Sequence, residues 1–181
     1  MQKNSPLEVR FNQVIRNVPD FPKPGILFKD ITPILADASL MSAIVNQLEA
    51  ELAKEEIDAI IGIESRGFIF GALLAQKLHK PFIPVRKAGK LPFHTLSESY
   101  SLEYGEASLE IHTDALQKGM KVLIHDDLLA TGGTAAAAGR LVKKLQAEVA
   151  VFSFLINLSF LPGFHNLEQE FGVKPHYLIK Y

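Results

Sequence analysis

The stretch VLIHDDLLATGGT, residues 122–134, constrains this chain more than any other part of it. Residues 122–124 form an apolar run that is typical of a parallel strand covered on both faces. Asp126 and Asp127 follow at its carboxyl end, which is the edge where ligands bind in open α/β sheets. Residues 135–146 then have the pattern of a helix. We therefore predict a strand, an acidic pair, a turn and a helix in that order.

The turn between the strand and the helix has the chemistry of a phosphate site. It consists of Ala130, Thr131, Gly132, Gly133 and Thr134. Because Gly132 and Gly133 have no Cβ, their backbone can approach a ligand closely. Their N–H groups and those of the helix start would face one concavity, which favours a phosphate.

The acidic pair predicts a different ligand group. Two carboxylates would repel a phosphate placed against them, so Asp126 and Asp127 are expected to accept hydrogen bonds from hydroxyls. A phosphate on the turn and two hydroxyls on the carboxylates describe a ribose 5-phosphate. Each fragment alone is also common as an ordinary turn or a solvated loop. A Walker A loop is excluded because no Lys precedes Thr134.

As a whole, residues 122–134 closely resemble the phosphoribosyl diphosphate signature of the type I phosphoribosyltransferases. The wording LLATGGT is similar to the branch of that family that uses adenine. The resemblance implies an α/β fold with a central, mainly parallel sheet flanked by helices. It also implies an N-terminal hood at about residues 1–35 and a flexible hairpin loop at about residues 87–112.

Length and charge agree with this class of enzyme. A chain of 181 residues is expected to form a single domain, residues 1–181. Lys and Arg total 19 against 20 for Asp and Glu, so no general attraction to nucleic acid or to anionic membranes is expected. The absence of Cys favours a reducing, cytoplasmic location. We see neither the apolar core of a signal peptide nor a run of the ~18 apolar residues that a membrane span needs.

The rest of the chain alternates strands and helices. Ser5 and Glu8 form a capping box, and one apolar helical face is expected to continue as far as Val18. The prolines and the glycine of residues 19–25 would end that helix. Strands are expected at residues 57–63, 82–86, 122–127, 149–156 and 177–179, and helices at residues 38–54, 68–79 and 135–146. Single helices between strands imply a parallel sheet with right-handed crossovers.

Residues 87–112 interrupt this alternation. SYSLEYG and ASLEIHT alternate apolar and polar residues around Gly105, which predicts an antiparallel hairpin. A hairpin alone is marginally stable, so we expect it to move until something closes it. It could equally be an ordinary edge hairpin. The resemblance implies a loop over the active site in which Glu103 handles the purine proton, with Glu106 and Glu110 as competitors.

Basic residues cluster where a diphosphate could bind. Cations occur in the turn ESRG and in RKAGK, although a single Lys is more often simply solvated. The resemblance implies a diphosphate site made of Glu64, Ser65, Arg66, Arg86, Lys87 and Lys90. Because RKAGKLP is similar to the segment that reaches a neighbouring subunit's site, it also implies a homodimer.

The segment DFPKPGILFKDITPIL, residues 20–35, resembles the family's hood over the base. By position, the backbone of Leu27 would read the adenine edge, and Phe28 and Leu161 would cover its two faces. Lys29 stands where the adenine branch often has Arg.

The resemblance as a whole implies transfer of the 5-phosphoribosyl group from phosphoribosyl diphosphate to adenine, which gives AMP and diphosphate. Mg²⁺ would arrive on the substrate, held by its oxygens and by water, with no direct metal ligand from the protein. Two alternatives stay open at this point. One is an enzyme for hypoxanthine, guanine or xanthine. The other is a non-catalytic regulator of the same fold that senses phosphoribosyl diphosphate.

Overall fold

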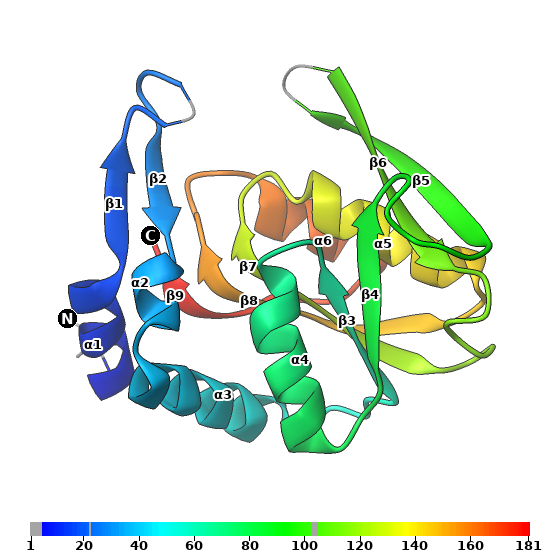
Figure 1. The fold of residues 1–181 in the computed structure, drawn as a ribbon, viewed down its shortest axis with the longest axis horizontal. Coiled ribbons are helices and arrows are strands. Elements are labelled where there is room, and N and C mark those ends of the chain that lie inside the picture. Colours follow the sequence, from blue (N-terminus) through cyan, green and yellow to red (C-terminus); the bar gives the residue numbers. More distant parts are fainter. Residues whose placement is uncertain (1–4, 22, 103–104) are drawn as a thin grey trace. The chain divides into compact units, whose positions relative to one another are not determined.

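The computed structural model describes residues 5–21, 23–102 and 105–181, which Figure 1 traces from blue to red. Contacts divide the chain into two units, Met1–Glu51 and Leu52–Tyr181, each with its own secondary structure. The expectation of a single domain over residues 1–181 stays a prediction. Within the described ranges, no helix combines the length and the apolar character that crossing a membrane requires.

The first unit opens with α1 (Pro6–Val14). The Ser5 hydroxyl accepts a hydrogen bond from the backbone N–H of Glu8 at 3.1 Å, as the capping box predicts. The predicted continuation of this helix to Val18 is wrong, because Val18 lies in strand β1 (Arg16–Pro19). That strand pairs with β2 (Leu27–Asp30), and the pairing supplies hydrogen bonds that a longer helix would otherwise have made.

Two further helices complete the first unit. They are α2 (Thr32–Leu35) and α3 (Ala38–Leu52), whose last residue belongs to the second unit. The side chain of Arg10 reaches from α1 to Asp37, just before α3, and donates to both carboxylate oxygens at 2.8 and 2.7 Å. The hydrogen bond from the Leu40 N–H, followed by that from Arg10, lowers the pKa of Asp37. This ion pair ties the start of the unit to its longest helix.

One seven-stranded sheet forms the second unit, in the order β5-β6-β4-β3-β7-β8-β9. Its strands are β3 (Ala59–Ile63), β4 (Phe82–Lys87), β5 (Thr95–Leu102), β6 (Gly105–His112), β7 (Lys121–Leu129), β8 (Glu148–Asn157) and β9 (His176–Lys180). Strands β4, β3, β7, β8 and β9 are parallel neighbours, which confirms the predicted mainly parallel sheet.

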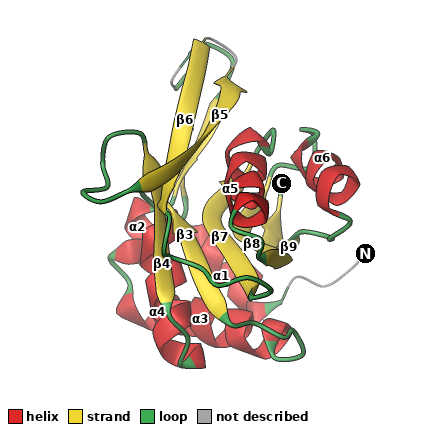
Figure 2. Cartoon of the chain, turned by 90° about the vertical axis from the view of Figure 1, so that its right-hand side faces the viewer, coloured by secondary structure: helices red, strands yellow, loops and turns green. Residues whose placement is uncertain are grey.

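Helices cover both faces of this sheet (Figure 2). They are α4 (Gly67–Leu78), α5 (Gly133–Lys144) and α6 (Gly163–Phe171). Ile61 and Ile63 of β3 join an apolar cluster that includes the alanines of α5. The residue between them, Gly62, faces α4, where an added Cβ would meet the carbonyl oxygen of Gly67 at 3.1 Å. The buried runs of the sequence predicted this two-sided cover, although α6 was not predicted.

The predicted hairpin is confirmed, and it continues the main sheet. Strands β5 and β6 pair antiparallel from Thr95↔His112 to Leu102↔Gly105. The other edge of β6 pairs antiparallel with β4, where Lys87 lies opposite Leu109. The sheet therefore supports one edge of the hairpin, and its mobility stays a prediction.

Candidate active site

The acidic pair lies inside β7, because the strand runs two residues beyond its predicted end to Leu129. Pairing with β8 holds this extension, with Leu129 opposite Asn157. Pairing with β3 on the other side stops earlier, where Gly62 lies opposite His125. Asp126 thus stands level with Ile63, the last residue of the neighbouring strand β3, and Asp127 lies just beyond that strand's carboxyl end.

The turn after β7 has the backbone that its glycines predict. Gly132 has φ +84°, a left-handed conformation, and it directly precedes α5. Its carbonyl oxygen accepts the first helical hydrogen bond, from the N–H of Ala136 at 2.8 Å. The N–H groups of the first turn of α5 have no partner within the helix and carry partial positive charge. Residues 130–134 and Asp126 line a hollow of about 80 Å³ at this turn.

The start of α6 holds this turn in place. The backbone N–H of Gly163 donates to the carbonyl oxygen of Ala130 at 3.1 Å. A Cβ added to Gly163 would lie only 2.2 Å from that same oxygen, so no other residue fits without a shift. The side-chain amide of Asn166 donates to the carbonyl oxygen of Thr131 at 3.0 Å. The sequence analysis missed Gly163 and Asn166, whose only local signal was a glycine after a proline.

The two carboxylates have different surroundings. Asp126 Oδ1 accepts a hydrogen bond from the backbone N–H of Asp127 at 2.8 Å. Burial raises the pKa of Asp126 well above its ordinary range, and the negative charge of Asp127 raises it further. Asp127 is 3% exposed and pairs with the Nε of Arg66. Arg66, which was predicted to bind diphosphate, therefore faces the carboxylate that was predicted to bind the sugar.

A second ion pair organises the predicted diphosphate segments. Arg86 donates from Nε to Glu64 at 3.1 Å and from a terminal nitrogen to the carbonyl oxygen of Lys90 at 3.0 Å. Glu64 also accepts from the backbone N–H of Lys87 at 3.1 Å. Burial by itself would raise the pKa of Glu64, but hydrogen bonds from Arg86 and Lys87 outweigh it and lower that pKa. Glu64 thus fixes the β4 segment with its side chain.

One cavity of about 410 Å³ unites much of the predicted site. Seven predicted residues line it: Glu64, Ser65, Arg66, Lys87, Asp126, Asp127 and Thr134. Tyr100 and Ala107 of the hairpin, which were not predicted, complete its described lining. A neighbouring cavity of about 620 Å³ reaches Thr131, Gly132 and Gly133. Carboxylates, cations and the glycine turn therefore meet at the carboxyl edge of the sheet.

The predicted adenine residues are divided between the two units. In the first, Leu27 is 51% exposed, and the Phe28 ring packs edge-on against Phe21 with centroids 5.2 Å apart. Lys29 Nζ donates to Asn17 Oδ1 at 2.8 Å, and burial lowers the pKa of Lys29. In the second unit, the Leu161 N–H donates to the carbonyl oxygen of Leu158 at 3.0 Å. Glu103 lies outside the described residues.

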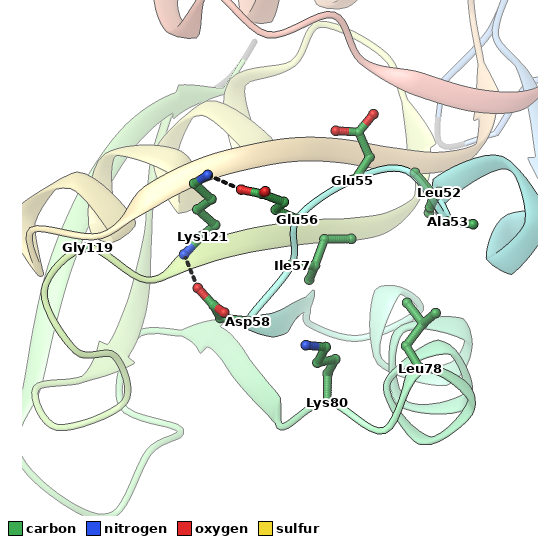
Figure 3. Close-up of a pocket in the computed structure, with 10 residues that line it drawn as sticks. All are labelled: Leu52, Ala53, Glu55, Glu56, Ile57, Asp58, Leu78, Lys80, Gly119 and Lys121. Atoms are coloured by element: carbon green, nitrogen blue, oxygen red, sulfur yellow. Dashed lines mark hydrogen bonds and ion pairs between the residues drawn. The ribbon is translucent and has the colours of Figure 1, made fainter.

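Another cavity, of about 550 Å³, lies at the amino end of the same sheet (Figure 3). Lys121 opens β7 there, and its side chain pairs with Glu56. Its backbone N–H donates to Asp58 Oδ2 at 2.8 Å. None of the residues predicted for the site lines this cavity, so the carboxyl edge is the better candidate.

Comparison with known proteins supports this assignment. The phosphoribosyl transferase domain family matches residues 29–157. An adenine phosphoribosyltransferase from Cytophaga hutchinsonii is 52% identical over 157 residues, which cover 87% of either chain. The crystal structure of adenine phosphoribosyltransferase from Thermoanaerobacter pseudethanolicus has a TM-score of 0.92 and 48% identity, and the match covers 96% of this chain and 99% of that one.

A more distant structure agrees. Adenine phosphoribosyltransferase from Saccharomyces cerevisiae, in complex with adenine and an iminoaltritol bisphosphate, has a TM-score of 0.87. It is 39% identical, and the match covers 95% of this chain and 98% of that one. Since the family match spans more than half of the chain and the relatives match nearly its whole length, this chain belongs to the phosphoribosyl transferase family, among the adenine phosphoribosyltransferases.

Proposed function

We propose that the chain transfers the 5-phosphoribosyl group of phosphoribosyl diphosphate to adenine, which gives AMP and diphosphate and salvages the purine. The observation that carries this proposal is the 410 Å³ cavity in which Asp126, Asp127, Arg66 and Thr134 meet. Hydroxyl acceptors, a cation and a helix start are the groups that this sugar phosphate needs. The relatives are adenine phosphoribosyltransferases, which supports adenine as the base.

The 5′-phosphate is assigned to residues 130–134. N–H groups at the start of α5 stabilise its charge, and Gly132 lets the backbone come close. The sugar hydroxyls donate to Asp126 and Asp127. In this proposal Arg66 leaves Asp127 when the substrate enters and turns toward the diphosphate, because the hydroxyls then take its place on the carboxylate.

The diphosphate is assigned to Ser65, Arg66 and Lys87, all of which line the cavity. Arg86 and Lys90 do not line the cavity and contribute positive potential only. Arg86 is already held by Glu64 and by the Lys90 carbonyl. Arg offers a planar fork for phosphate oxygens, whereas Lys provides a compact charge. As the bond to the sugar loosens, these cations stabilise the negative charge that gathers on the leaving group.

Catalysis in this proposal is mostly positioning and electrostatics. Positive charge grows on the sugar carbon as diphosphate leaves, and a purine nitrogen then bonds to that carbon. Glu103 is the proposed acceptor of the purine ring proton. When bound with the substrate, Mg²⁺ would offset the negative charge of the diphosphate. In the ranges that the structure describes, no three His, Cys, Asp or Glu side chains form a group that could hold a metal.

The base is assigned to Leu27, Phe28 and Leu161, with a contribution from Lys29. The yeast relative in complex with adenine supports this choice of base. Backbone groups of Leu27 would match the amino donor and the ring acceptor of adenine, and hypoxanthine would mismatch both. Leaving such buried groups unpaired typically discriminates between substrates by about 10⁴-fold to 10⁵-fold.

Assembly and location extend the proposal. The chain is proposed to act in the cytoplasm as a homodimer in which RKAGKLP, residues 86–92, reaches the partner's site. Residues 1–181 would form a single domain with the hood at about residues 1–35. Light scattering on the purified protein tests the dimer, and a monomer with full activity would contradict it.

A panel of purines tests the reaction. The purified protein, phosphoribosyl diphosphate and Mg²⁺ are incubated with adenine, hypoxanthine, guanine or xanthine, and release of diphosphate is followed. Rapid release of diphosphate is expected with adenine and not with the other three purines. Comparable kcat/KM for adenine and hypoxanthine would contradict the assignment of the base, and no release with any purine would contradict the enzyme activity.

A further inference from the structure

Tyr100 of β5 stands at a junction that the sequence analysis did not anticipate. It lines the 410 Å³ cavity over the two carboxylates and also the 620 Å³ cavity beside Gly132. Among the described residues, it alone belongs to both linings. A ribose 5-phosphate that bridges Asp127 and the turn would therefore pass beside this side chain.

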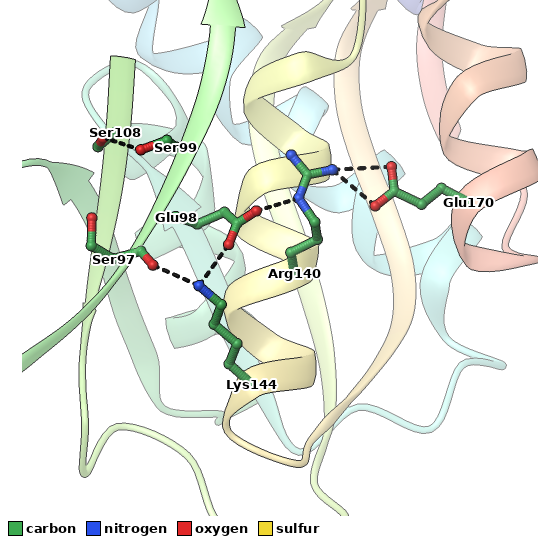
Figure 4. Close-up of polar contacts among 7 residues, drawn as sticks. All are labelled: Ser97, Glu98, Ser99, Ser108, Arg140, Lys144 and Glu170. Carbon is green, nitrogen blue, oxygen red and sulfur yellow. Dashed lines mark hydrogen bonds and ion pairs between the residues drawn. The ribbon is translucent and has the colours of Figure 1, made fainter. Parts of the chain in front are cut away.

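Contacts made by the side chains on one face of β5 fix the position of Tyr100. Side chains alternate along a strand, so Leu96, Glu98 and Tyr100 point to the same side of β5. Leu96 and Tyr100 pack against the apolar cluster of the second unit. Glu98, between them, accepts hydrogen bonds from Arg140 Nε at 2.6 Å and from Lys144 Nζ at 2.7 Å, both on α5 (Figure 4).

The ion pairs that begin at Glu98 continue through Arg140 to α6. Arg140 donates from one terminal nitrogen to both oxygens of Glu170, at 2.9 and 3.1 Å. Lys144 Nζ also donates to the carbonyl oxygen of Ser97 at 2.7 Å. The hydrogen bond from Lys144 lowers the pKa of Glu98, and burial opposes it without reversing it. An ionised Glu98 therefore ties the hairpin to the two helices that form and hold the phosphate turn.

We propose that the Tyr100 hydroxyl donates a hydrogen bond to the 5′-phosphate and that Glu98 is the positioning residue that holds it there. This inference rests on the proposed function, because it takes residues 130–134 as the phosphate site. The side chain of Tyr100 is partly buried and makes no hydrogen bond to the described residues. A tyrosine combines an apolar ring with a polar tip, and a phosphate oxygen is a strong acceptor for that hydroxyl.

Binding measurements on Tyr100→Phe test the contact, with AMP and Mg-diphosphate as separate probes in calorimetry. Only AMP carries the 5′-phosphate, so its Kd should rise about 10-fold to 100-fold, the usual range for a hydrogen bond to a charged group. The Kd for diphosphate should change less than about twofold. In turnover, KM for phosphoribosyl diphosphate should rise while kcat is largely kept, as for a contact made equally in ground and transition states.

Tyr177→Phe is the matched control, because Tyr177 is another partly buried tyrosine in a strand of the same sheet and packs against Phe164. It should leave both Kd values unchanged. An unchanged Kd for AMP in Tyr100→Phe would overturn the inference, and so would an equal loss for both probes, which would indicate general damage to the site. Wild-type turnover of adenine in the same preparation separates these outcomes from failure of the proposed function.

Glu98→Gln tests the positioning role. Loss of its charge weakens both links to α5, so the Kd for AMP should rise severalfold, but less than in Tyr100→Phe. Combined with Tyr100→Phe, it should add nothing further, because both changes act through the same hydroxyl. Fully additive effects would overturn the positioning role, and restoration of AMP binding by Glu98→Asp would support it.

Discussion

The two ends of the parallel sheet carry cavities of similar size in which the charged side chains are arranged differently. At the amino end, the Glu56 side chain pairs with that of Lys121, and Asp58 accepts a hydrogen bond from the Lys121 backbone N–H. At the carboxyl end, Asp126 and Asp127 lie side by side, and burial raises the pKa of Asp126. Cavity volume therefore does not distinguish the active site. A buried carboxylate pair that raises the pKa of one member is the stronger indication of a functional site, even though Arg66 offsets part of the charge of Asp127.

Glycines at the two ends give the same contrast. Gly119 at the amino end has φ +80°, and an added Cβ would meet nothing within 4 Å. Gly132 at the carboxyl end has φ +84°, and an added Cβ would lie 3.1 Å from Gly163. The φ angles are nearly the same, whereas the space around the two glycines differs. The pair thus separates backbone strain from the requirements of the site.

Gly132→Ala should show the largest effect. Its Cβ would press on the backbone of Gly163 and displace the turn that is proposed to bind the phosphate, so kcat/KM for phosphoribosyl diphosphate should fall by about 100-fold or more, as after a displacement of about 1 Å at a site. Gly119→Ala carries the same left-handed strain, on the order of 1 kcal/mol, and should lower stability without changing kcat/KM. Steady-state kinetics and urea unfolding of both variants provide the check. Equal loss of activity in both would remove the distinction.

Asp127→Asn should come next. It replaces an ionic acceptor by a neutral amide and releases Arg66, so turnover should fall by roughly tenfold or more, because charge-assisted hydrogen bonds are about twice as strong as neutral ones. Asp58→Asn makes the same chemical change at the amino end, where we expect turnover within about twofold of wild type. Initial rates with adenine decide the matter. Wild-type rates in Asp127→Asn would mean that turnover depends no more on the carboxyl-end carboxylate than on the one at the amino end.

His125, buried in β7 between the two ends, should make stability depend on pH. Burial lowers the pKa of His125 to about 3, and the charge of His176 adds to this shift. The unfolded imidazole binds its proton near pH 6.5, so the contribution of His125 to the free energy of unfolding should fall by about 1.4 kcal/mol for each unit that the pH drops from 6.5 toward 3. His125→Leu should flatten this slope, and His165→Leu at the surface should not. Urea unfolding at several pH values measures it, and parallel slopes in all three proteins would be the contrary result.

Glu56→Gln should show the smallest effect. The Glu56 side chain is highly exposed, and such a surface pair is screened by water and salt, so breaking it should change neither melting temperature nor kcat measurably. Thermal unfolding and an adenine assay at low and high salt test this. A clear loss of activity would show that the amino-end cavity serves the reaction.

Local sequence was sufficient where one segment determines its own structure. The apolar run, acidic pair, glycine turn and helix of residues 122–144 are all present, and the parallel strands lie within two residues of their predicted ends. The predicted helix through Val18 failed because β1 pairs with β2, whose residues follow their partners by 8 to 14 positions. Helix propensity is a weak prior when such pairing is available.

Contacts between segments set the part of the site that local patterns could not predict. The hydrogen bonds of Arg86 with Glu64 and of Arg66 with Asp127 join residues 22 and 61 positions apart, and either Arg could equally have faced solvent. Helix α6 was detectable, since Phe164, Leu167 and Phe171 recur at helical spacing. Its hold on the turn through Gly163 was not, because a glycine after a proline usually marks only a loop.

The contacts of Gly163 and Asn166 with the turn limit how far the predicted phosphate motif can be transplanted. If residues 122–134 were grafted into another α/β protein, Gly132 and Ala130 would arrive without the backbone of Gly163 and the amide of Asn166 against them. The turn would then sample many conformations, and the entropic cost of ordering it would weaken binding of the phosphate. A working graft would have to carry two separate pieces of chain, the signature and the first turn of α6.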